Sequence, residues 1–315
     1  MFIRLKTLVI ICFIFVLLII FHFAVFQHKY DADSFIENPV PKSDEFGVPP
    51  WPARPLYGIK GAPVDVPSDL ESESKDTFSQ HQFNLVASDL IGEYRPLPDY
   101  RYEECLTEDI PSPDILKKLA TSVIIVFHNE AKSTLIRTIS SVIYTTPRYL
   151  LHEIILVDDQ STLAFLKQEL EDYVKTLPVT IKIIRVGKRS GLINARLSGA
   201  KLATGGTLTF LDAHCETTAG WLDHAIAEIA KNRKAVVCPI IDIISDTDFA
   251  YIKGGESTWG GFDWDLTFHW YHTKRLISNP RLGDRRSSSI KTPAMAGGLF
   301  TIERDYFYEV SGILQ

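Results

Sequence analysis

The feature that most constrains the fold is an alternation of short apolar runs with amphipathic stretches between residues 122 and 241. The apolar runs are rich in β-branched residues and predict strands, whereas the intervening stretches have apolar residues at helical spacing. Strands separated by helices predict an α/β fold, with a mostly parallel sheet and helices on both faces. The predicted strands are 122–127, 153–157, 180–186, the run from Leu208 into Asp212, and 235–241; the predicted helices are 133–144, 164–176, 192–203 and 221–232.

Three of these strands end in polar clusters. The clusters are His128-Asn129-Glu130, Asp158-Asp159 and Asp212-Ala213-His214. Ligands of open parallel sheets bind beyond the carboxyl ends of the strands. We therefore expect the three clusters to converge on one site.

The last cluster suggests a metal site. If the strand stays extended through its tip, Asp212 and His214 point to the same side, because side chains alternate along a strand, and Ala213 lets a ligand approach the backbone. A carboxylate and an imidazole with open positions suit Mn²⁺ better than structural zinc. An Asp-x-His is common by chance, so this prediction depends on the apolar strand that precedes it.

A nucleotide could bind beside that ion. Asp158 or Asp159 can accept hydrogen bonds from ribose hydroxyls, although either can instead cap the following loop. Arg189 lies in a Gly-flanked loop before a helix and can meet a phosphate or ribose, or be a solvated loop charge. The sequence has no dinucleotide-binding Gly-x-Gly-x-x-Gly and no P-loop. A metal beside a diphosphate favours sugar transfer from a nucleotide sugar.

Composition bounds the partners and the cysteine chemistry. The chain has 315 residues, 45% of them apolar, and a net charge of −6 with no basic stripe, so we expect no nucleic-acid partner. Cys12 lies in the N-terminal apolar run, which leaves Cys105, Cys215 and Cys238 as an odd set that cannot all pair internally.

The N-terminal third predicts a membrane anchor and a stem. Residues 8–26 are almost wholly apolar and follow Arg4 and Lys6, which predicts a transmembrane signal-anchor with residues 1–7 cytoplasmic and the rest luminal. A cleaved signal peptide is the alternative. Residues 27–113 are rich in proline and predict a luminal stem, whose last part packs on a catalytic domain at 114–315.

Seven stretches, taken together, resemble the polypeptide N-acetylgalactosaminyltransferases, the family that starts mucin-type O-glycosylation in the Golgi. They keep the family's order and spacing over roughly residues 120–310. The stretches are 122–131, 153–159, 189–193, 209–216 (Thr-Phe-Leu-Asp-Ala-His-Cys-Glu), 236–242, 260–264 and 292–300.

The resemblance implies a GT-A glycosyltransferase fold, which is Rossmann-like, and transfer of GalNAc from UDP-GalNAc to Ser or Thr of proteins with retention of configuration. It also implies Mn²⁺ as the cofactor and a single-pass type II Golgi membrane protein. By position, Asp212 and His214 are metal ligands, and Asp159, Arg189 and Ala213 contact the donor. The resemblance assigns no catalytic residue.

The chain departs from the family pattern in two ways. Asn194 stands beside Arg196 where the family usually has Arg. The family's Trp-Gly-Gly-Glu-Asn segment, its third metal ligand (a histidine), the expected disulfide partner of Cys105 and the lectin domain would all follow Gln315, so we expect a truncated gene product, isoform or fragment.

Two further motifs each have two possible interpretations. Gly297-Gly298 resembles the floor of the donor site, and it can equally be a pair for close backbone packing. The aromatic residues Trp264, Phe268, Trp270 and Tyr271 can face an acceptor peptide or form core.

The main hypothesis is thus a Golgi polypeptide GalNAc-transferase with an incomplete acceptor half. The alternative is a catalytically inactive luminal protein that binds UDP or partner transferases. A third hypothesis is a GT-A transferase that uses another nucleotide sugar.

Overall fold

The computed structural model describes residues 34–37, 57–106, 110–255, 258–272 and 289–311. The predicted cytoplasmic tail and signal-anchor (residues 1–26) lie outside these ranges. Within the ranges, no helix has both the length and the apolar character needed to cross a membrane.

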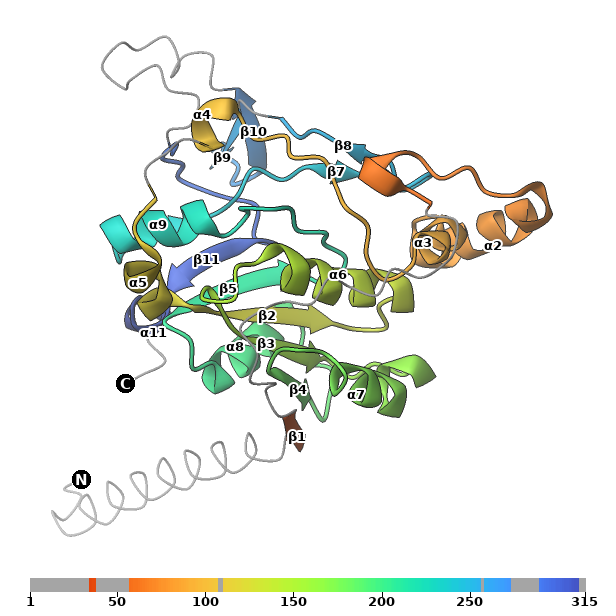
Figure 1. The fold of residues 1–315 in the computed structure, drawn as a ribbon, viewed down its shortest axis with the longest axis horizontal. Coiled ribbons are helices and arrows are strands. Elements are labelled where there is room, and N and C mark those ends of the chain that lie inside the picture. The colour runs from red at the N-terminus through yellow and green to blue at the C-terminus, as the bar shows by residue number, and fades with distance from the viewer. Residues whose placement is uncertain (1–33, 38–56, 107–109, 256–257, 273–288, 312–315) are drawn as a thin grey trace, which may run out of the picture.

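One seven-stranded sheet organises the molecule, in the order β1-β4-β3-β2-β5-β11-β6 (Figure 1). Its four central strands run parallel to one another. They are β4 (Ile181–Arg185), β3 (Leu151–Asp158), β2 (Thr121–Phe127) and β5 (Thr207–Asp212). These strands match the predicted ones to within two residues, because each is a buried apolar run.

The edges of the sheet contain antiparallel pairs that the sequence did not predict. β1 (Ser34–Glu37) pairs antiparallel with β4 at one edge. At the other edge, β11 (Phe300–Glu303) inserts antiparallel between β5 and β6 (Val236–Val237). The sheet is therefore mixed, parallel at its centre and antiparallel at both edges. The strand predicted over 235–241 is only two residues long, since Pro239 has no N–H to donate to a neighbouring strand.

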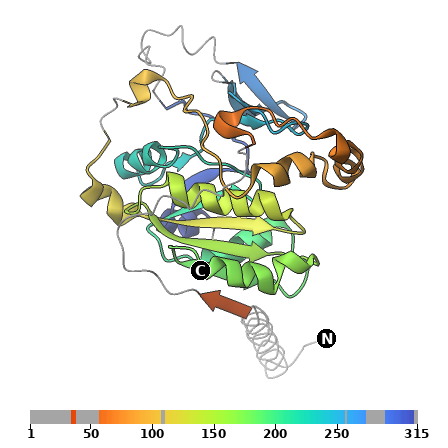
Figure 2. The same cartoon turned by 45° about the vertical axis from the view of Figure 1, so that its right-hand side comes forward.

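Helices cover both faces of the sheet, as predicted (Figure 2). On one face α6 (Lys132–Thr145) and α7 (Gln168–Val174, after a 3-10 turn at Ala164–Leu166) bury a core around Ile125. On the other face α8 (Leu192–Leu202) and α11 (Arg304–Ser311) pack on Ile124 and its neighbours. Since Ile124 and Ile125 are successive residues of β2, the alternation of side chains along one strand supplies both cores.

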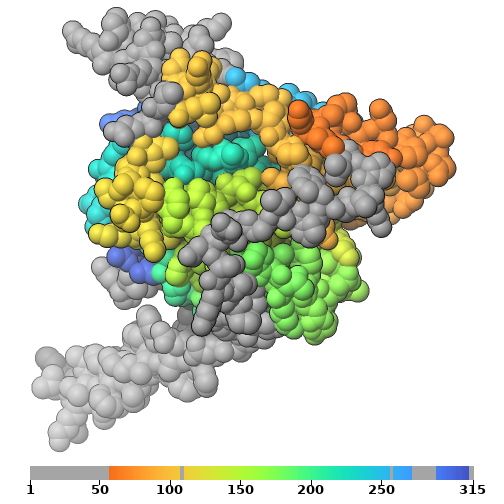
Figure 3. Space-filling model, in the orientation of Figure 1, coloured from red at the N-terminus to blue at the C-terminus, as the bar shows by residue number. Residues whose placement is uncertain are grey.

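The segment before β2 packs on the sheet domain over much of its described length. It contains η1 (Ile59–Gly61), η2 (Ser68–Leu70), α2 (Glu71–His81), α3 (Leu85–Ile91), α4 (Glu103–Leu106), α5 (Pro113–Leu116) and η3 (Lys117–Leu119). Val64, Ala87 and Ile91 form a small apolar cluster with Phe249. Figure 3 shows this segment, in orange and yellow, lying along the outer surface of the molecule. The stem boundary at residue 113 stays a prediction.

The remaining strands lie on the side of helices α6 and α9 (Asp223–Lys231) that faces away from the central sheet. They are two antiparallel pairs, β7 (Ile243–Ile244) with β8 (Tyr251–Ile252) and β9 (Thr258–Phe262) with β10 (Phe268–His272). Figure 1 shows both pairs at the top of the view, above the central sheet.

Candidate functional site

The three polar clusters come together at the carboxyl ends of β2, β3 and β5, as predicted. His128 Nδ1 lies 2.8 Å from the backbone oxygen of Asp159, which joins the ends of β2 and β3. His214 Nδ1 lies 3.1 Å from Glu130 Oε2, which joins the ends of β2 and β5. The parallel order β3-β2-β5 makes these strand ends neighbours, and the clusters therefore form one site.

The strand β5 ends at Asp212, and Ala213 and His214 form a turn. The expectation that the chain stays extended through His214 is therefore wrong. The turn is held from α6, since the Thr138 hydroxyl donates to the Ala213 carbonyl over 2.9 Å. Proximity of the two predicted ligands thus depends on this turn and not on strand alternation.

His214 is oriented by a carboxylate. The hydrogen bond to Glu130 is the main cause that raises the pKa of His214, and the charges of Glu130 and Asp212 act in the same direction. When Nδ1 donates to Glu130, Nε2 keeps its lone pair for a metal ion. Glu130 is itself fixed, because its Oε1 accepts from the Ala131 amide and the Thr134 hydroxyl.

The side chain of Asp212 is 35% exposed and packs against Gly298. A Cβ atom added at Gly298 would lie 2.5 Å from Asp212 Oδ2, so a glycine is needed there to keep the carboxylate in place. A carboxylate oxygen and an imidazole nitrogen suit Mn²⁺. The described ranges contain no group of three His, Cys, Asp or Glu side chains that could hold a metal, so Asp212 and His214 could supply only part of a coordination shell.

Arg196 on α8 is a neighbour of Asp212 that the sequence did not identify as a site residue. Its Nη2 donates to Asp212 Oδ1 over 3.1 Å, and its Nη1 donates to the Gly297 carbonyl over 2.7 Å. A further contact of 3.3 Å reaches the carbonyl of Gly298. Arg196 therefore joins Asp212 to the glycine pair, and its place next to the family's Gly-Leu-Ile motif is the signal that could have found it. The Asn194 amide, by contrast, donates to the Ser190 carbonyl over 2.9 Å.

Asp159 is fully buried and holds the loop before α8. Its Oδ1 accepts from the Ser190 amide and hydroxyl, at 2.7 and 2.9 Å, and its Oδ2 accepts from the Gly191 amide and from Arg189. Burial alone would raise the pKa of Asp159, but these hydrogen bonds and the Arg189 charge hold it below the ordinary value. Contact with a ribose stays a prediction for Asp159. Asp158 caps its own loop, accepting from the Ser161 amide over 2.6 Å.

Arg189 and Ala213 are the other two predicted donor contacts. The Arg189 side chain is half exposed, with one nitrogen on Asp159, so the rest of the guanidinium faces solvent beside the first turn of α8. Ala213 is buried, and its carbonyl accepts from Thr138. Their contact with a donor stays a prediction.

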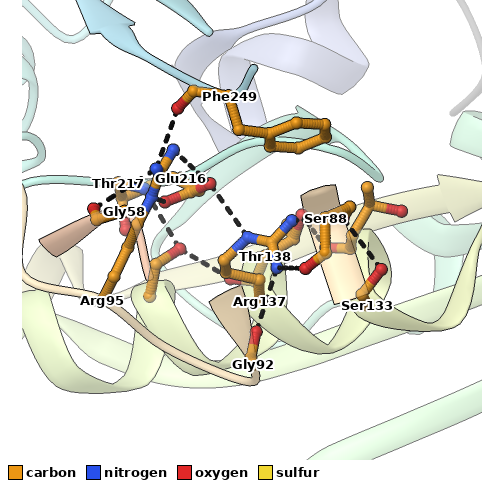
Figure 4. A network of polar contacts seen from close by, with 12 residues as sticks. Gly58, Ser88, Gly92, Arg95, Ser133, Arg137, Thr138, Glu216, Thr217 and Phe249 are labelled. Carbon is orange, nitrogen blue, oxygen red and sulfur yellow. Dashed lines mark hydrogen bonds and ion pairs between the residues drawn. The ribbon is translucent and has the colours of Figure 1, made fainter. Parts of the chain in front are cut away.

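A buried ionic network lies behind the turn (Figure 4). Glu216 accepts from Arg95 and Arg137, and all three side chains are at most 4% exposed. Sequence reasoning missed this network, because Arg95 lies in the expected stem and no local spacing connects it to Glu216. The structure alone brings the two residues together.

The cysteines of the described part form no disulfide with one another. Cys105 and Cys238 line a cavity of about 330 Å³ together with Trp221 and residues along α9. Burial is the main cause that raises the pKa of Cys215 to about 12, which keeps this thiol protonated and unreactive. The expected disulfide of Cys105 stays a prediction.

The model of glycosyl transferase family 2 matches residues 122–310, which include all three polar clusters. Polypeptide N-acetylgalactosaminyltransferase 13 of Rattus norvegicus is 54% identical over 253 residues, which are 80% of this chain and 45% of that protein. Polypeptide N-acetylgalactosaminyltransferase 3 of Drosophila melanogaster is 50% identical over 254 residues, 80% of this chain and 38% of the relative. The chain thus spans less than half the length of these relatives.

A solved structure has the same fold. The crystal structure of GalNAc-T7 with UDP, GalNAc and Mn²⁺ superposes with a TM-score of 0.73 at 36% identity, and the match covers 88% of this chain and 52% of that one. The expected GT-A fold, with helices on both faces of the sheet, is confirmed by this match and by the family model.

Proposed function

Because the chain belongs to glycosyl transferase family 2, where its curated relatives are polypeptide N-acetylgalactosaminyltransferases, we propose that it transfers GalNAc from UDP-GalNAc to Ser and Thr hydroxyls of proteins. The observation that carries this proposal is the arrangement around Asp212 and His214. The carboxylate side chain of Asp212 is 35% exposed, and the imidazole of His214 is fixed by Glu130.

Asp212 and His214 would hold Mn²⁺, which would neutralise charge on the departing diphosphate. Arg196 keeps Asp212 in place. The half-exposed Arg189 and the N-terminus of α8 form a positive edge, to which we assign the donor phosphates. The acceptor hydroxyl would attack on the face that UDP leaves, which gives retention of configuration.

We assign the acceptor peptide to the β9–β10 hairpin. Trp264 is fully exposed at its tip, and Leu266, Phe262 and Trp270 are also exposed. These exposures count against the core alternative for Trp264 and Trp270. Trp259 and Tyr271 stack at 4.7 Å between ring centroids and stiffen the hairpin. An exposed row of aromatic side chains on a stiff ribbon suits an extended peptide.

For the whole protein we propose a single-pass type II Golgi membrane protein anchored by residues 8–26, with the sheet domain in the lumen. The support is the charge pattern of the sequence and the family resemblance. A tag placed after residue 311, with protease added to sealed microsomes, tests the orientation. A tag that is protected from the protease supports a luminal domain, and a tag that is digested contradicts it.

The decisive experiment measures Mn²⁺-dependent binding and turnover of UDP-GalNAc by the purified chain with a Ser/Thr-rich peptide. Transfer to the peptide supports the enzyme. Binding without transfer supports the second candidate, a luminal UDP-binding protein, which is favoured by the finding that described residues supply only two predicted metal ligands. UDP-GlcNAc and UDP-galactose as competing donors test the third hypothesis. A preference for either of them over UDP-GalNAc contradicts the GalNAc assignment.

A further inference from the structure

The turn that carries His214 is held in place from behind. Three residues of α6 contact it. The Thr138 hydroxyl donates to the carbonyl of Ala213, the Arg137 Nε donates to Glu216 over 2.9 Å, and the Ser141 hydroxyl accepts from the Thr217 amide over 3.0 Å. The backbone on both sides of Glu216 is thus fixed to one helix.

Glu216 receives a second arginine from outside the sheet domain. Arg95 Nε donates to Oε2 over 2.8 Å and Nη2 donates to Oε1 over 3.1 Å, which is a bidentate pair. The side chains of Arg95 and Glu216 are 1% and 4% exposed. Arg95 and Glu216 lie 121 residues apart in sequence.

Arg95 is itself held by two other segments. Its Nη1 donates to the carbonyl of Phe249 over 2.8 Å and lies 3.4 Å from the carbonyl of Gly58. Gly58 has a φ of +66°, and a Cβ there would lie 2.7 Å from this nitrogen, so glycine is required at this position. Figure 4 shows the Arg95 guanidinium between Glu216 and Phe249. The guanidinium therefore occupies one fixed place.

This geometry makes the position of Glu216 depend on Arg95. A buried carboxylate must stay paired, and loss of one partner leaves charge in a medium that solvates it poorly. Arg137 reaches Oε1, whereas Oε2 is bound by Arg95. A shift of Glu216 would unpair Oε2, and Glu216 is two residues from His214. Arg95 thus restrains the turn through a rigid, charge-assisted contact.

We propose that Arg95 is a positioning residue for the metal-binding turn, acting through Glu216, so that the segment before β2 is part of the active site's framework. The metal aspect of this inference rests on the proposed function, whereas restraint of the turn does not. The segment 57–95, expected from sequence to be stem, then has a direct role in holding Asp212 and His214 at their working separation.

The test compares Arg95→Met with Asn84→Ala in the full chain. Arg95→Met keeps much of the side-chain length and removes the fork. Asn84 is the matched control, because it ties the same segment to the Thr247 carbonyl over 2.7 Å and makes no contact with Glu216. Arg95→Lys, which keeps the charge, serves if the Met variant does not fold.

Amide hydrogen exchange is the first measurement. We expect Arg95→Met to speed exchange of amides 213–217 at least about tenfold, and Asn84→Ala to leave these amides unchanged while exposing residues 84–91. Equal protection of 213–217 in Arg95→Met and in the unsubstituted chain overturns the positioning role. Loss of protection there in both variants overturns it as well, since that pattern indicates general loosening.

Mn²⁺ affinity in the presence of UDP is the second measurement. We expect the apparent Kd for Mn²⁺ to rise about tenfold in Arg95→Met, with UDP affinity at saturating Mn²⁺ within about twofold. Equal loss of both affinities contradicts a specific action on the turn. If the unsubstituted chain binds no Mn²⁺, the proposed donor site fails, and hydrogen exchange alone decides whether Arg95 restrains the turn.

Discussion

Gly298 and Asp212 lie so close that no residue larger than glycine fits at position 298 without displacing the Asp212 carboxylate. A Cβ at position 298 would be 2.5 Å from Asp212 Oδ2 and 3.3 Å from Cγ, whereas a Cβ at Gly297 would meet nothing within 4 Å. This close approach agrees with the interpretation of the glycine pair as a close-packing element, and its place at the floor of the donor site stays a prediction. Gly297 contributes its carbonyl, which accepts from Arg196.

This pair gives the sharpest prediction. Gly298→Ala should weaken Mn²⁺-dependent UDP binding about tenfold or more, because the new methyl group displaces a ligand carboxylate. Isothermal titration calorimetry with UDP at fixed Mn²⁺ measures the change. Gly297→Ala, the matched control, should stay within about twofold; similar affinities for the two variants would contradict the placement of Asp212 in the site.

Asp212→Ala should abolish Mn²⁺-dependent UDP binding, since it removes one of only two predicted ligands in the described part of the chain. Thermal unfolding with and without Mn²⁺ and UDP provides the measurement. The unsubstituted protein should gain stability from the ligands and the variant should not. Asp69→Asn, on the exposed turn η2, should behave like the unsubstituted protein. An unchanged ligand effect in Asp212→Ala would sink the metal assignment.

Asp159→Ala should destabilise the protein by about 2–4 kcal/mol, because it leaves the amides of Ser190 and Gly191 without their buried acceptor. Urea denaturation measures the free energy of unfolding. Arg189→Met should cost less than about 1 kcal/mol, since Arg189 is half exposed. A smaller loss for Asp159→Ala than for Arg189→Met would show that the carboxylate does not hold this loop.

Trp264→Ala should raise the KM for a peptide acceptor several-fold and leave UDP binding unchanged, because this side chain is fully exposed on the hairpin. Steady-state kinetics with varied peptide give KM and kcat separately. Val310→Ala, an exposed apolar residue on α11, is the control. If peptide KM is the same in both variants, the hairpin tip is not an acceptor surface.

Glu153 should contribute an acid-sensitive part of stability. Burial alone would raise the pKa of Glu153, but hydrogen bonds from Lys182, Thr204 and Ser122 hold it below the ordinary 4.5. A lowered pKa stabilises the fold above the ordinary value, and this contribution disappears as pH falls through the folded-state pKa. Lys182 Nζ lies 2.6 Å from Glu153 Oε2, so the buried pair adds to the effect.

Glu153→Gln should therefore cost about 3 kcal/mol at neutral pH, and its deficit against the unsubstituted protein should shrink below about pH 4.5. Denaturation midpoints between pH 3 and 7 measure this trend. Glu71→Gln on the exposed helix α2 should show no such trend. A deficit for Glu153→Gln that is constant over this range would show that Glu153 is not the titrating group.

The central half of the fold was predictable because its strands are completely buried. Ile124 and Ile155 lie in runs of apolar residues with clear ends, and parallel pairing follows from the helices between them. β11 was not predictable, since its antiparallel place between β5 and β6 depends on pairing between residues 64 to 96 positions apart in sequence. Periodicity contains no information on such pairing.

The site divides in the same way. Asp212 and His214 follow a run of residues that clearly predicts a strand. The proximity of His214 to Glu130 follows from the order of the strands in the sheet. The network around Glu216 has no sequence signal, because an arginine in a proline-rich segment is normally solvated. Only the packed structure shows that Arg95 is 3% exposed and paired.

The contact between Arg95 and Glu216 also sets an order of events during synthesis. The segment that contains Gly58 and Arg95 leaves the ribosome early, but its partners extend to Phe249. At usual rates of translation, synthesis of the stretch from Gly58 to Phe249 takes roughly 10–40 seconds. During that interval Ala87 and Ile91, which are buried in the finished protein, have no Phe249 to pack against. This early segment is thus among the last parts of the chain to reach its native partners, which makes it a natural target for chaperones.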